Sequence, residues 1–400
     1  MEKRRAPKLR FQGFTDDWEQ RKLGNISDSY SGGTPSVGKA NYYGGNIPFI
    51  RSAEVNSETT ELFLTEEGLK NSSAKIVNKG DILYALYGAT SGEVGLARFD
   101  GAINQAILDI KPYESYDASF IMHWLRKNKK SIIGTFLQGG QGNLSGTIVT
   151  SLMIDCPYYN EQQKIGAFFE QLGNLITLHQ RKYDMLQKVK KSMLEKMFPK
   201  NGSKVPEIRF AGFTDDWEQR KVSELVEKYE DPVETPHNGY TRLGIRSHAK
   251  GTFHEYVEPG HELETAQMHR VAANKLIFNI TFAWEHAVAI TDEDDAGKLV
   301  SHRFPQFSLS DSLSPEFLQY VILDEDFHHH LYLASPGGAG RNRVLKIKEA
   351  LDYPIYYPSV NEQHKIGMYF DMLTYLITLH QRQRILDLKW VFSAFSDMLE

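Results

Sequence analysis

Residues 33–39, Gly-Thr-Pro-Ser-Val-Gly-Lys, have the spacing of a loop that binds nucleotide phosphates through backbone amides and a lysine. That loop also needs a serine or threonine directly after the lysine, because this hydroxyl binds Mg²⁺. Position 40 is an alanine, and no apolar strand precedes the glycines. The sequence therefore predicts no phosphate site here.

Three consecutive histidines, His328–His330, have side chains that ligate metals. No carboxylate or thiol stands at zinc-protease spacing from them, so we expect a surface helix end. The acidic run Asp292–Asp295 predicts a solvated turn. The chain also lacks GxSxG, HExxH and a GxGxxG that follows a strand. We therefore expect no catalytic residues, no metal and no cofactor bound by this chain itself.

The chain repeats two blocks of sequence. RFQGFTDDWEQRK at 10–22 returns as RFAGFTDDWEQRK at 209–221 with one difference, at an offset of 199 residues. NEQQKIG at 160–166 returns as NEQHKIG at 361–367, and LITLHQR at 175–181 returns at 376–382, both at an offset of 201. We call these blocks the frame and the unlike sequences between them the inserts. A repeated frame predicts the same kind of partner twice, and unlike inserts predict two targets.

The two inserts have the same predicted order of elements. In the first, about 23–157, strands are expected at 81–87, 94–99 and 103–110, and Asp117 is expected to cap a short helix over 118–125. In the second, about 222–358, strands are expected at 276–281 and 287–291, with Ser314 and Pro315 beginning a helix over 316–323. This order predicts one fold that carries two different surfaces.

A long helix is predicted to follow each insert. Apolar or ring-bearing residues recur at 3–4 spacing, which indicates a coiled-coil seam interrupted by Lys190: Phe169, Leu172, Ile176, His179, Tyr183, Leu186, Met193 and Met197. The second copy keeps the seam to His380 and then slips by one position to Ile385, Leu388, Phe392, Phe395 and Leu399. At ~1.5 Å per residue, a helix of about 36 residues extends ~54 Å. We expect the two helices to pair with each other as a spacer.

Composition is that of a globular protein, with 400 residues, 41% hydrophobic and 24% charged. The single cysteine excludes an intramolecular disulfide, and we expect a cytoplasmic protein without a signal peptide or a membrane span. The net charge of −5 argues against a nucleic-acid binder that works alone.

The duplicated frame, divergent inserts and paired helices resemble the specificity subunit of type I restriction–modification systems. Similarity to a target recognition domain of that family is carried by FTDDWEQRKLG (14–24), SGGTPS (31–36), YYGGNIPFIRSAEVN (42–56), GDILYALYGATSG (80–92) and INQAI (103–107). CPYYNEQQKIGAFFEQL (156–172) and DYPIYYPSVNEQHKIG (352–367) resemble the family's entry into its long helices. The second insert departs from the first at GGTPS and GATSG.

The resemblance implies an α+β fold with two similar mixed α/β target recognition domains in tandem. Two long antiparallel coiled-coil helices would join them as a pseudo-two-fold repeat. The predicted limits are 1–157 for the first domain, 158–205 for the central helix, 206–358 for the second domain and 359–400 for the C-terminal helix. A non-catalytic scaffold, or a fragment of a fused type IIG-like restriction–methylation enzyme, is the alternative.

The family's function implies that each insert reads half of a bipartite, asymmetric site in double-stranded DNA, chiefly in the major groove. Two methyltransferase subunits using S-adenosylmethionine, and restriction subunits using ATP and Mg²⁺, would join it, and the complex would lie on the nucleoid when bound to DNA. Polar loop residues are the candidate DNA contacts, namely Ser31, Thr34, Tyr42, Tyr43, Arg51, Thr90, Ser91, Gln138, Gln141, Asn143, Arg242, Arg246, His248, Lys250, Asn279, His286, Arg341, Asn342 and Arg343. The candidate subunit contacts on the frame are Ile165, Phe168, Leu175, Leu178, His179, Arg181, Ile366, His380 and Arg382.

Overall fold

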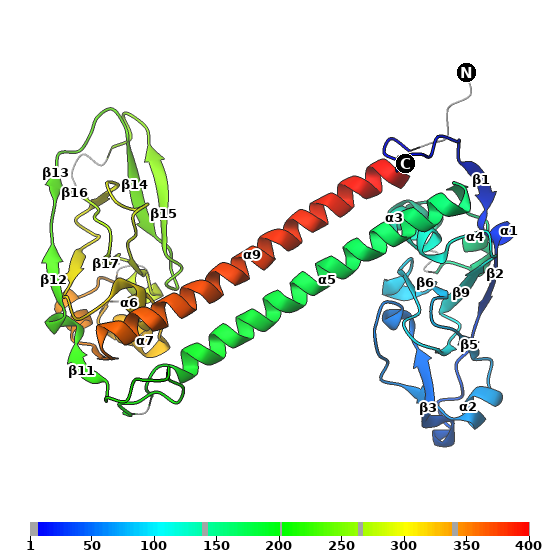
Figure 1. Cartoon of the computed structure of the whole chain (residues 1–400), viewed down its shortest axis with the longest axis horizontal. Helices are drawn as coiled ribbons and strands as arrows, with labels where there is room; N and C mark the ends of the chain where they lie inside the picture. The colour runs from blue at the N-terminus through cyan, green and yellow to red at the C-terminus, as the bar shows by residue number, and fades with distance from the viewer. Residues whose placement is uncertain (1–6, 138–142, 201, 263–266, 338–342, 400) are drawn as a thin grey trace. The chain divides into compact units, whose positions relative to one another are not determined.

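A computed structural model describes residues 7–137, 143–200, 202–262, 267–337 and 343–399. The fold is α+β, as the sequence predicts, and the chain forms two compact units (Figure 1). Unit 1 contains residues 1–181 and 381–400, and unit 2 contains residues 182–380. Each unit therefore holds one insert, the start of the long helix that follows it and the end of the other long helix. The four sequence-based domain limits remain a prediction.

Unit 1 contains two four-stranded sheets. The antiparallel sheet has the order β2 (Ser27–Ser31), β9 (Ile107–Pro112), β6 (Ile82–Ala85) and β7 (Val94–Leu96). The mixed sheet has the order β4 (Phe63–Leu64), β3 (Tyr43–Ile50), β8 (Gly101–Ile103) and β5 (Lys75–Val77), with β3 and β8 parallel. The helices of the insert are α1 (Leu23–Ile26), α2 (Glu66–Lys70), α3 (Ala118–Phe136) and α4 (Gly146–Thr150).

Unit 2 repeats this topology with other residues and adds one edge strand to its mixed sheet. Its antiparallel sheet has the order β12 (Val226–Tyr229), β20 (Gln306–Leu309), β17 (Lys275–Phe278) and β18 (Val288–Ile290). Its mixed sheet has the order β13 (Pro232–Val233), β16 (Met268–Arg270), β19 (Leu299–Ser301), β14 (Tyr240–Ile245) and β15 (Thr252–Val257), with β14 and β19 parallel. The helices are α6 (Pro315–Val321), α7 (Glu325–Leu333) and α8 (Ile347–Leu351). The prediction of one fold in both inserts is confirmed.

A two-stranded sheet closes each insert. In unit 1, β1 (Glu19–Lys22) pairs antiparallel with β10 (Met153–Cys156), and in unit 2, β11 (Glu218–Lys221) pairs with β21 (Pro354–Tyr357). The repeated EQRK sequence thus forms the entry strand of each insert and holds the exit strand beside it. The preceding tryptophans, Trp18 and Trp217, are buried in the two main cores.

Most of the predicted strands and helix starts are confirmed, but one predicted strand is wrong. The Asp117 side chain accepts a hydrogen bond from the Phe120 amide at 2.8 Å, and Ser314 caps α6. However, the helix after Asp117 runs to Phe136, well beyond residue 125. The predicted strand at 103–110 is wrong, because a turn at 104–106 divides it into β8 and β9, which belong to different sheets. The acidic run is also not fully solvated, since Asp295 is buried and binds Thr252 and His254.

The long helices are α5 (Tyr159–Lys196) and α9 (Val360–Leu399), and within each unit the start of one lies beside the end of the other (Figure 1). The seam of α5 is buried or half-buried at every predicted position. In α9 the predicted slip is wrong: Ile385 is exposed, whereas Asp387, Ala394 and Met398 are buried. These positions continue the 3–4 spacing from Phe370 without a break. Side chains at 392, 395 and 399 lie outside the description.

Among the described helices, none combines the length and the apolarity that a membrane crossing needs.

Candidate functional site

In unit 1 the segment before β1 is fastened to the start of α5. Arg10 donates two hydrogen bonds to Glu161, at 2.8 and 2.6 Å, and a third to the backbone oxygen of Asp16 at 2.7 Å. Glu161 is buried, and its carboxylate raises the pKa of Arg10 chiefly through these hydrogen bonds. The Phe11 ring meets the Phe168 ring edge to face at 5.8 Å. We call this arrangement the clasp.

Unit 2 contains the same clasp. Arg209 donates to both oxygens of Glu362 at 2.7 and 2.8 Å, and Phe210 meets Tyr369 edge to face at 5.9 Å. The frame is thus repeated as structure as well as sequence. Each clasp holds the entry of its insert to the long helix that follows the same insert, so each half of the chain contains its own clasp.

Several candidate DNA contacts of the first insert have structural partners. Tyr42 is buried and accepts a hydrogen bond from Lys39 at 2.9 Å. Ser91 is buried and donates to the Leu86 carbonyl at 3.1 Å. Tyr43 is half-buried and donates to the Pro35 carbonyl at 2.7 Å. The residue types at these positions are explained by packing, without DNA.

The remaining first-insert candidates are more accessible. Thr34 is exposed and donates to Gln105, and Arg51 is exposed but paired with Glu54 at 2.6 Å. Thr90 and Asn143 lie together, because Thr90 donates to the Tyr87 carbonyl and Asn143 pairs with Tyr87 in an isolated bridge. Ser31 is half-buried at the end of β2, and Gln138 and Gln141 lie outside the described residues.

In the second insert, three candidates lie on one turn, the β14–β15 hairpin at 246–251. Arg246, His248 and Lys250 are all exposed there. His248 and Ala249 have left-handed backbone conformations, with φ of 62° and 48°, which side-chain-bearing residues adopt only under constraint. The constraint is visible: their amides donate to the carbonyls of Glu285 and His286, both at 2.8 Å. The turn is therefore held in one conformation that displays three basic side chains.

The other described second-insert candidates are either paired or buried. Arg242 is paired with Glu255 at 2.6 Å, and Arg343 lies 4.1 Å above the Tyr332 ring. Asn279 is buried and accepts hydrogen bonds from Thr281. His286 is buried, its ring stacks on His328, and burial is the main cause that lowers its pKa. Arg341 and Asn342 lie outside the described residues.

Candidate subunit contacts on the frame divide by burial. Ile165 and Ile366 are each 1% exposed, so their apolar character is explained by the core and they offer no surface to a partner. Phe168 is half-buried in the clasp. Leu175 and Leu178 are exposed. The polar candidates are His179 and His380, which are half-buried, and Arg181 and Arg382, which are exposed.

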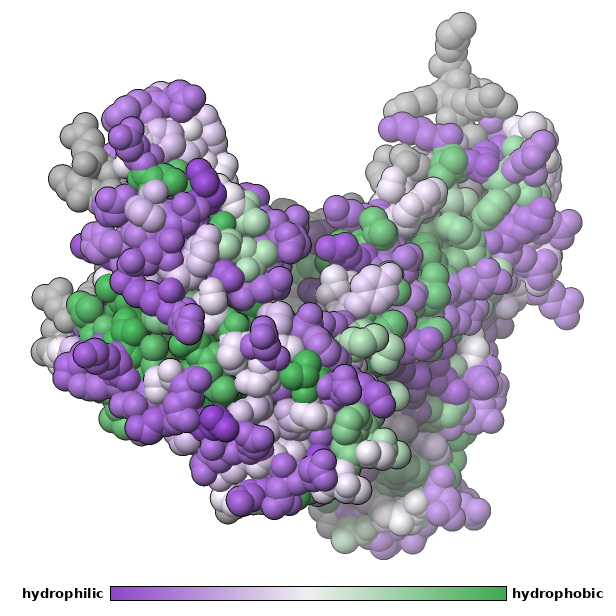
Figure 2. All heavy atoms as spheres, turned by 60° about the vertical axis from the view of Figure 1, so that its left-hand side comes forward, coloured by the Kyte–Doolittle hydropathy of each residue, from purple (hydrophilic) through white to green (hydrophobic). Residues whose placement is uncertain are grey.

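α9 also has an outer apolar face that the sequence pattern did not predict. Met368, Met372, Tyr375 and Leu379 are exposed at 3–4 spacing in unit 2, on a different side of the helix from the seam residue Phe370. Figure 2 shows hydrophobic residues in patches among the hydrophilic residues that cover most of the face drawn there. A second apolar stripe on a helix whose first stripe is already paired is typical of a surface for partner helices.

Among the described residues, no group of three or more histidine, cysteine, aspartate or glutamate side chains is arranged to hold an ion. The loop at 33–39 leads into a three-residue 3-10 helix, and Lys39 donates to Tyr42. It is therefore not placed at the start of a long helix, as a phosphate loop is.

Residues 15–188 match the family model described as the type I restriction modification DNA specificity domain. The chain is 26% identical over 190 residues to the type I restriction enzyme MjaIX specificity subunit of Methanocaldococcus jannaschii, covering 46% of this chain and 44% of that protein. It is 21% identical over 384 residues to the MjaVIII specificity subunit of the same organism, covering 92% and 89%. The match to the first relative thus spans less than half of its length.

The fold is similar to that of the S subunit of a type I restriction-modification system from M. genitalium. The TM-score is 0.61, with 11% sequence identity and 99% of each chain covered. At this identity the likeness concerns the fold. It extends over both inserts and both long helices.

Proposed function

Because the chain belongs to the specificity-subunit family of type I restriction–modification systems, we propose that its two inserts read the two halves of one bipartite, asymmetric DNA target. The proposal rests on one observation, namely that the two inserts share a topology but present unlike surfaces. Both inserts share the order of four strands in each of two sheets, with β13 added at one edge in the second, whereas the basic hairpin at 246–251 belongs to the second insert alone. Unlike readers require unlike half-sites, and so an asymmetric target.

The hairpin is the strongest candidate reader of the second insert. A turn that is fixed before binding loses little conformational entropy when it meets DNA. Arginine pairs with guanine by two hydrogen bonds in the major groove, and lysine contacts phosphates or guanine. In the first insert, the loop bearing Thr90 and Asn143 is the corresponding candidate, since hydroxyl and amide groups suit base edges.

The frame is proposed to bind two copies of one methyltransferase subunit, to which restriction subunits are added. The identical LITLHQR segments place Leu178 and Arg181 on α5, and Leu379 and Arg382 on α9, in equivalent helical positions. The exposed stripe that includes Met372 and Tyr375 extends this surface in unit 2. The methyltransferase would supply S-adenosylmethionine chemistry, and the restriction subunit would supply ATP- and Mg²⁺-dependent chemistry. This chain would determine where the complex binds DNA.

Mapping methylated bases tests the proposal. The chain is expressed with its modification subunit in a methylation-free host, and modified adenines are located by single-molecule sequencing. The expected result is a split, asymmetric motif with a fixed gap that disappears when this chain is omitted. Methylation that is unchanged without the chain would exclude the specificity role.

Exchange of one insert is the sharper version of this experiment. Residues 23–157 are replaced by the insert of another specificity subunit, leaving both clasps intact. Only one half of the motif should then change. A change in both halves would contradict independent reading by the two inserts.

A further inference from the structure

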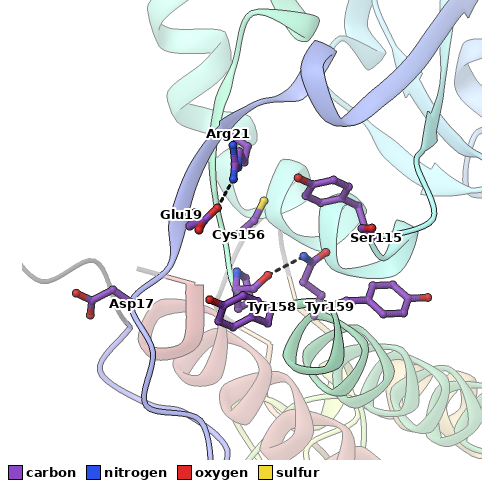
Figure 3. A pocket seen from close by; sticks show the side chains of 10 residues that line it. Asp17, Glu19, Arg21, Ser115, Cys156, Tyr158 and Tyr159 are labelled. Carbon is purple, nitrogen blue, oxygen red and sulfur yellow. Dashed lines mark hydrogen bonds and ion pairs between the residues drawn. The ribbon is translucent and has the colours of Figure 1, made fainter.

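A pocket of about 300 Å³ lies beside the frame in unit 1 (Figure 3). Gln162, one of its lining residues, donates to the Pro157 carbonyl at 2.8 Å and accepts a hydrogen bond from the Asp117 amide at 3.0 Å. Gln363 makes the two corresponding contacts in unit 2, both at 2.8 Å. The pocket therefore lies at a junction of insert and helix that both copies of the frame contain. A feature found in one insert only is the hairpin at 246–251.

The second strand of this hairpin is bound to a buried carboxylate. Asp295 lies in the turn between β18 and β19 and is 1% exposed. Its carboxylate accepts a hydrogen bond from the Thr252 hydroxyl at 2.9 Å and is hydrogen-bonded to Nε2 of His254 at 2.7 Å. The amide of Asp292 donates to the other carboxylate oxygen at 3.2 Å. The carboxylate thus joins its own turn to a strand that begins 43 residues earlier in the chain.

Thr252 also contacts the basic side chain at the other end of the turn. The Arg246 guanidinium donates to the Thr252 carbonyl and lies 5.2 Å from the centroid of the Phe253 ring. That ring packs against β14 at Gly244, where a Cβ atom would lie only 2.3 Å from it. The hydroxyl of Thr252 is therefore bound to Asp295, and the carbonyl of Thr252 is bound to Arg246.

The charge of Arg246 and one edge of its guanidinium are available to a ligand. Its contacts are with a carbonyl and an aromatic ring, and neither of these carries a formal charge. The hydrogen bond to Thr252 uses Nη1, and within the described part of the chain Nε and Nη2 have no hydrogen-bond partner. These two groups can donate parallel hydrogen bonds to a pair of neighbouring acceptors. In the major groove of DNA, O6 and N7 of guanine form such a pair.

We propose that Asp295 is a positioning residue for the reading of a guanine by Arg246. The Asp295 carboxylate holds the Thr252 hydroxyl, and the Thr252 carbonyl and the Phe253 ring hold the guanidinium in one orientation. An arginine that is fixed before binding loses less side-chain entropy on DNA. The inference rests on the proposed function, which makes DNA the ligand, and it adds the buried residue on which the choice of base depends.

Thr252→Val tests this connection with a small change. Valine has nearly the shape of threonine but lacks the hydroxyl, and the carbonyl that binds Arg246 remains. Asp295 keeps its contacts with His254 and with a backbone amide, so unit 2 should fold. Thr252→Ser restores the hydroxyl and is the rescue variant. Thr241→Val, at a half-buried position of β14, is the matched control.

Binding of the assembled complex is measured by fluorescence anisotropy on duplexes that contain the motif found by methylation mapping, altered one base pair at a time. Thr252→Val should lower discrimination about tenfold at one base pair, the one at which Arg246→Ala also relaxes the choice of base. Thr252→Ser and Thr241→Val should keep the wild-type choice. In the Arg246→Ala background, Thr252→Val should have no further effect, because the group that it positions is gone. A merely structural loss would instead weaken binding to all sequences alike.

Hydrogen–deuterium exchange of the full chain without DNA tests the positioning separately. Thr252→Val should speed exchange of the amides at 246–252, whereas Thr241→Val should not, and unchanged exchange after Thr252→Val would overturn the inference. If Arg246→Ala relaxes the choice of base and Thr252→Val does not, the inference is overturned while the proposed function stands. If neither variant alters the choice of base, the hairpin does not read DNA, and the inference fails together with that part of the proposed function.

Discussion

Arg10 binds Glu161 across 151 residues of sequence, through two hydrogen bonds of 2.8 and 2.6 Å to a buried carboxylate. Arg209 binds Glu362 in the same way across 153 residues. Each pair joins the entry of an insert to the helix that leaves it. The two clasps should therefore stabilise the two units independently.

Replacement of Arg10 by alanine should destabilise unit 1 by about 3 kcal/mol, because the buried Glu161 loses its cation. Hydrogen–deuterium exchange should report faster opening in unit 1 and unchanged protection in unit 2. Arg209→Ala is the matched control and should reverse this pattern. Equal loss of protection in both units after either substitution would contradict independent clasps.

The frame and the helices could be predicted from sequence because they depend on local pattern. The repeated blocks contain the four residues of the two ion pairs, although the sequence did not predict their pairing, and 3–4 spacing predicted α5. The slip predicted in α9 failed for a physical reason: Arg384 and Asp387 occupy inward positions of a seam, where a sequence pattern expects apolar residues. A polar seam residue is indistinguishable from a surface residue until its helix has a partner.

The exposure of the candidate DNA contacts was less predictable, because the polarity of a loop does not reveal which of its side chains are buried. Tyr42 and Ser91 are polar residues of predicted loops, and both are buried with hydrogen-bond partners. The conformation of the hairpin at 246–251 could not be predicted from sequence either, because it depends on hydrogen bonds from the amides of residues 248 and 249 to the carbonyls of residues 285 and 286. Only the tertiary fold brings these segments together.

Lys190 is expected to weaken the helix seam that it interrupts. It is half-buried, donates to Thr374 at 2.7 Å and lies 5.4 Å from the Tyr320 ring centroid, and burial lowers its pKa. Lys190→Leu should raise the stability of unit 2 by about 1 kcal/mol, since it removes a partly desolvated ammonium from an apolar seam. Lys191→Leu, on the neighbouring exposed position, should change stability little. Thermal unfolding of the two variants provides the comparison, and a destabilised Lys190→Leu would show that its polar contacts outweigh its desolvation.

Asp109 should make unit 1 less stable above about pH 6. It is buried in β9, and burial raises the pKa of its carboxyl from 3.8 to about 6. Because the pKa of Asp109 is higher in the folded protein than in the unfolded chain, the neutral carboxyl contributes its full stability below the unfolded-state pKa. This contribution is lost as pH rises through about 6. Asp109→Asn should therefore stabilise the protein by about 2 kcal/mol at pH 8 and by little at pH 4. Melting temperatures across this range test it, with exposed Glu114→Gln as the control, and a pH-independent difference would refute it.

The hairpin at 246–251 offers the most direct test of DNA reading. Arg246 and Lys250 are exposed on this turn, where the Arg246 guanidinium donates to the Thr252 carbonyl and lies 5.2 Å from the Phe253 ring centroid. Neither contact neutralises the charge of Arg246, whereas Arg242 on the adjoining strand is paired with Glu255. Arg246→Ala and Lys250→Ala should each weaken binding of the assembled complex to a DNA duplex that contains the motif found by methylation mapping. Arg242→Ala should have a smaller effect, because its charge is partly neutralised before DNA arrives.

Salt dependence then separates phosphate contacts from base contacts. If Lys250 lies on a phosphate, its removal should reduce the slope of log K against log salt by about 0.9 and weaken all sequences alike. If Arg246 reads a guanine, its removal should cost about 1–3 kcal/mol at one base pair of the second half-site and relax the choice of base there. Fluorescence anisotropy over a salt series, on duplexes altered one base pair at a time, measures both. A loss for Arg242→Ala as large as for the hairpin variants would remove the hairpin from the reading surface.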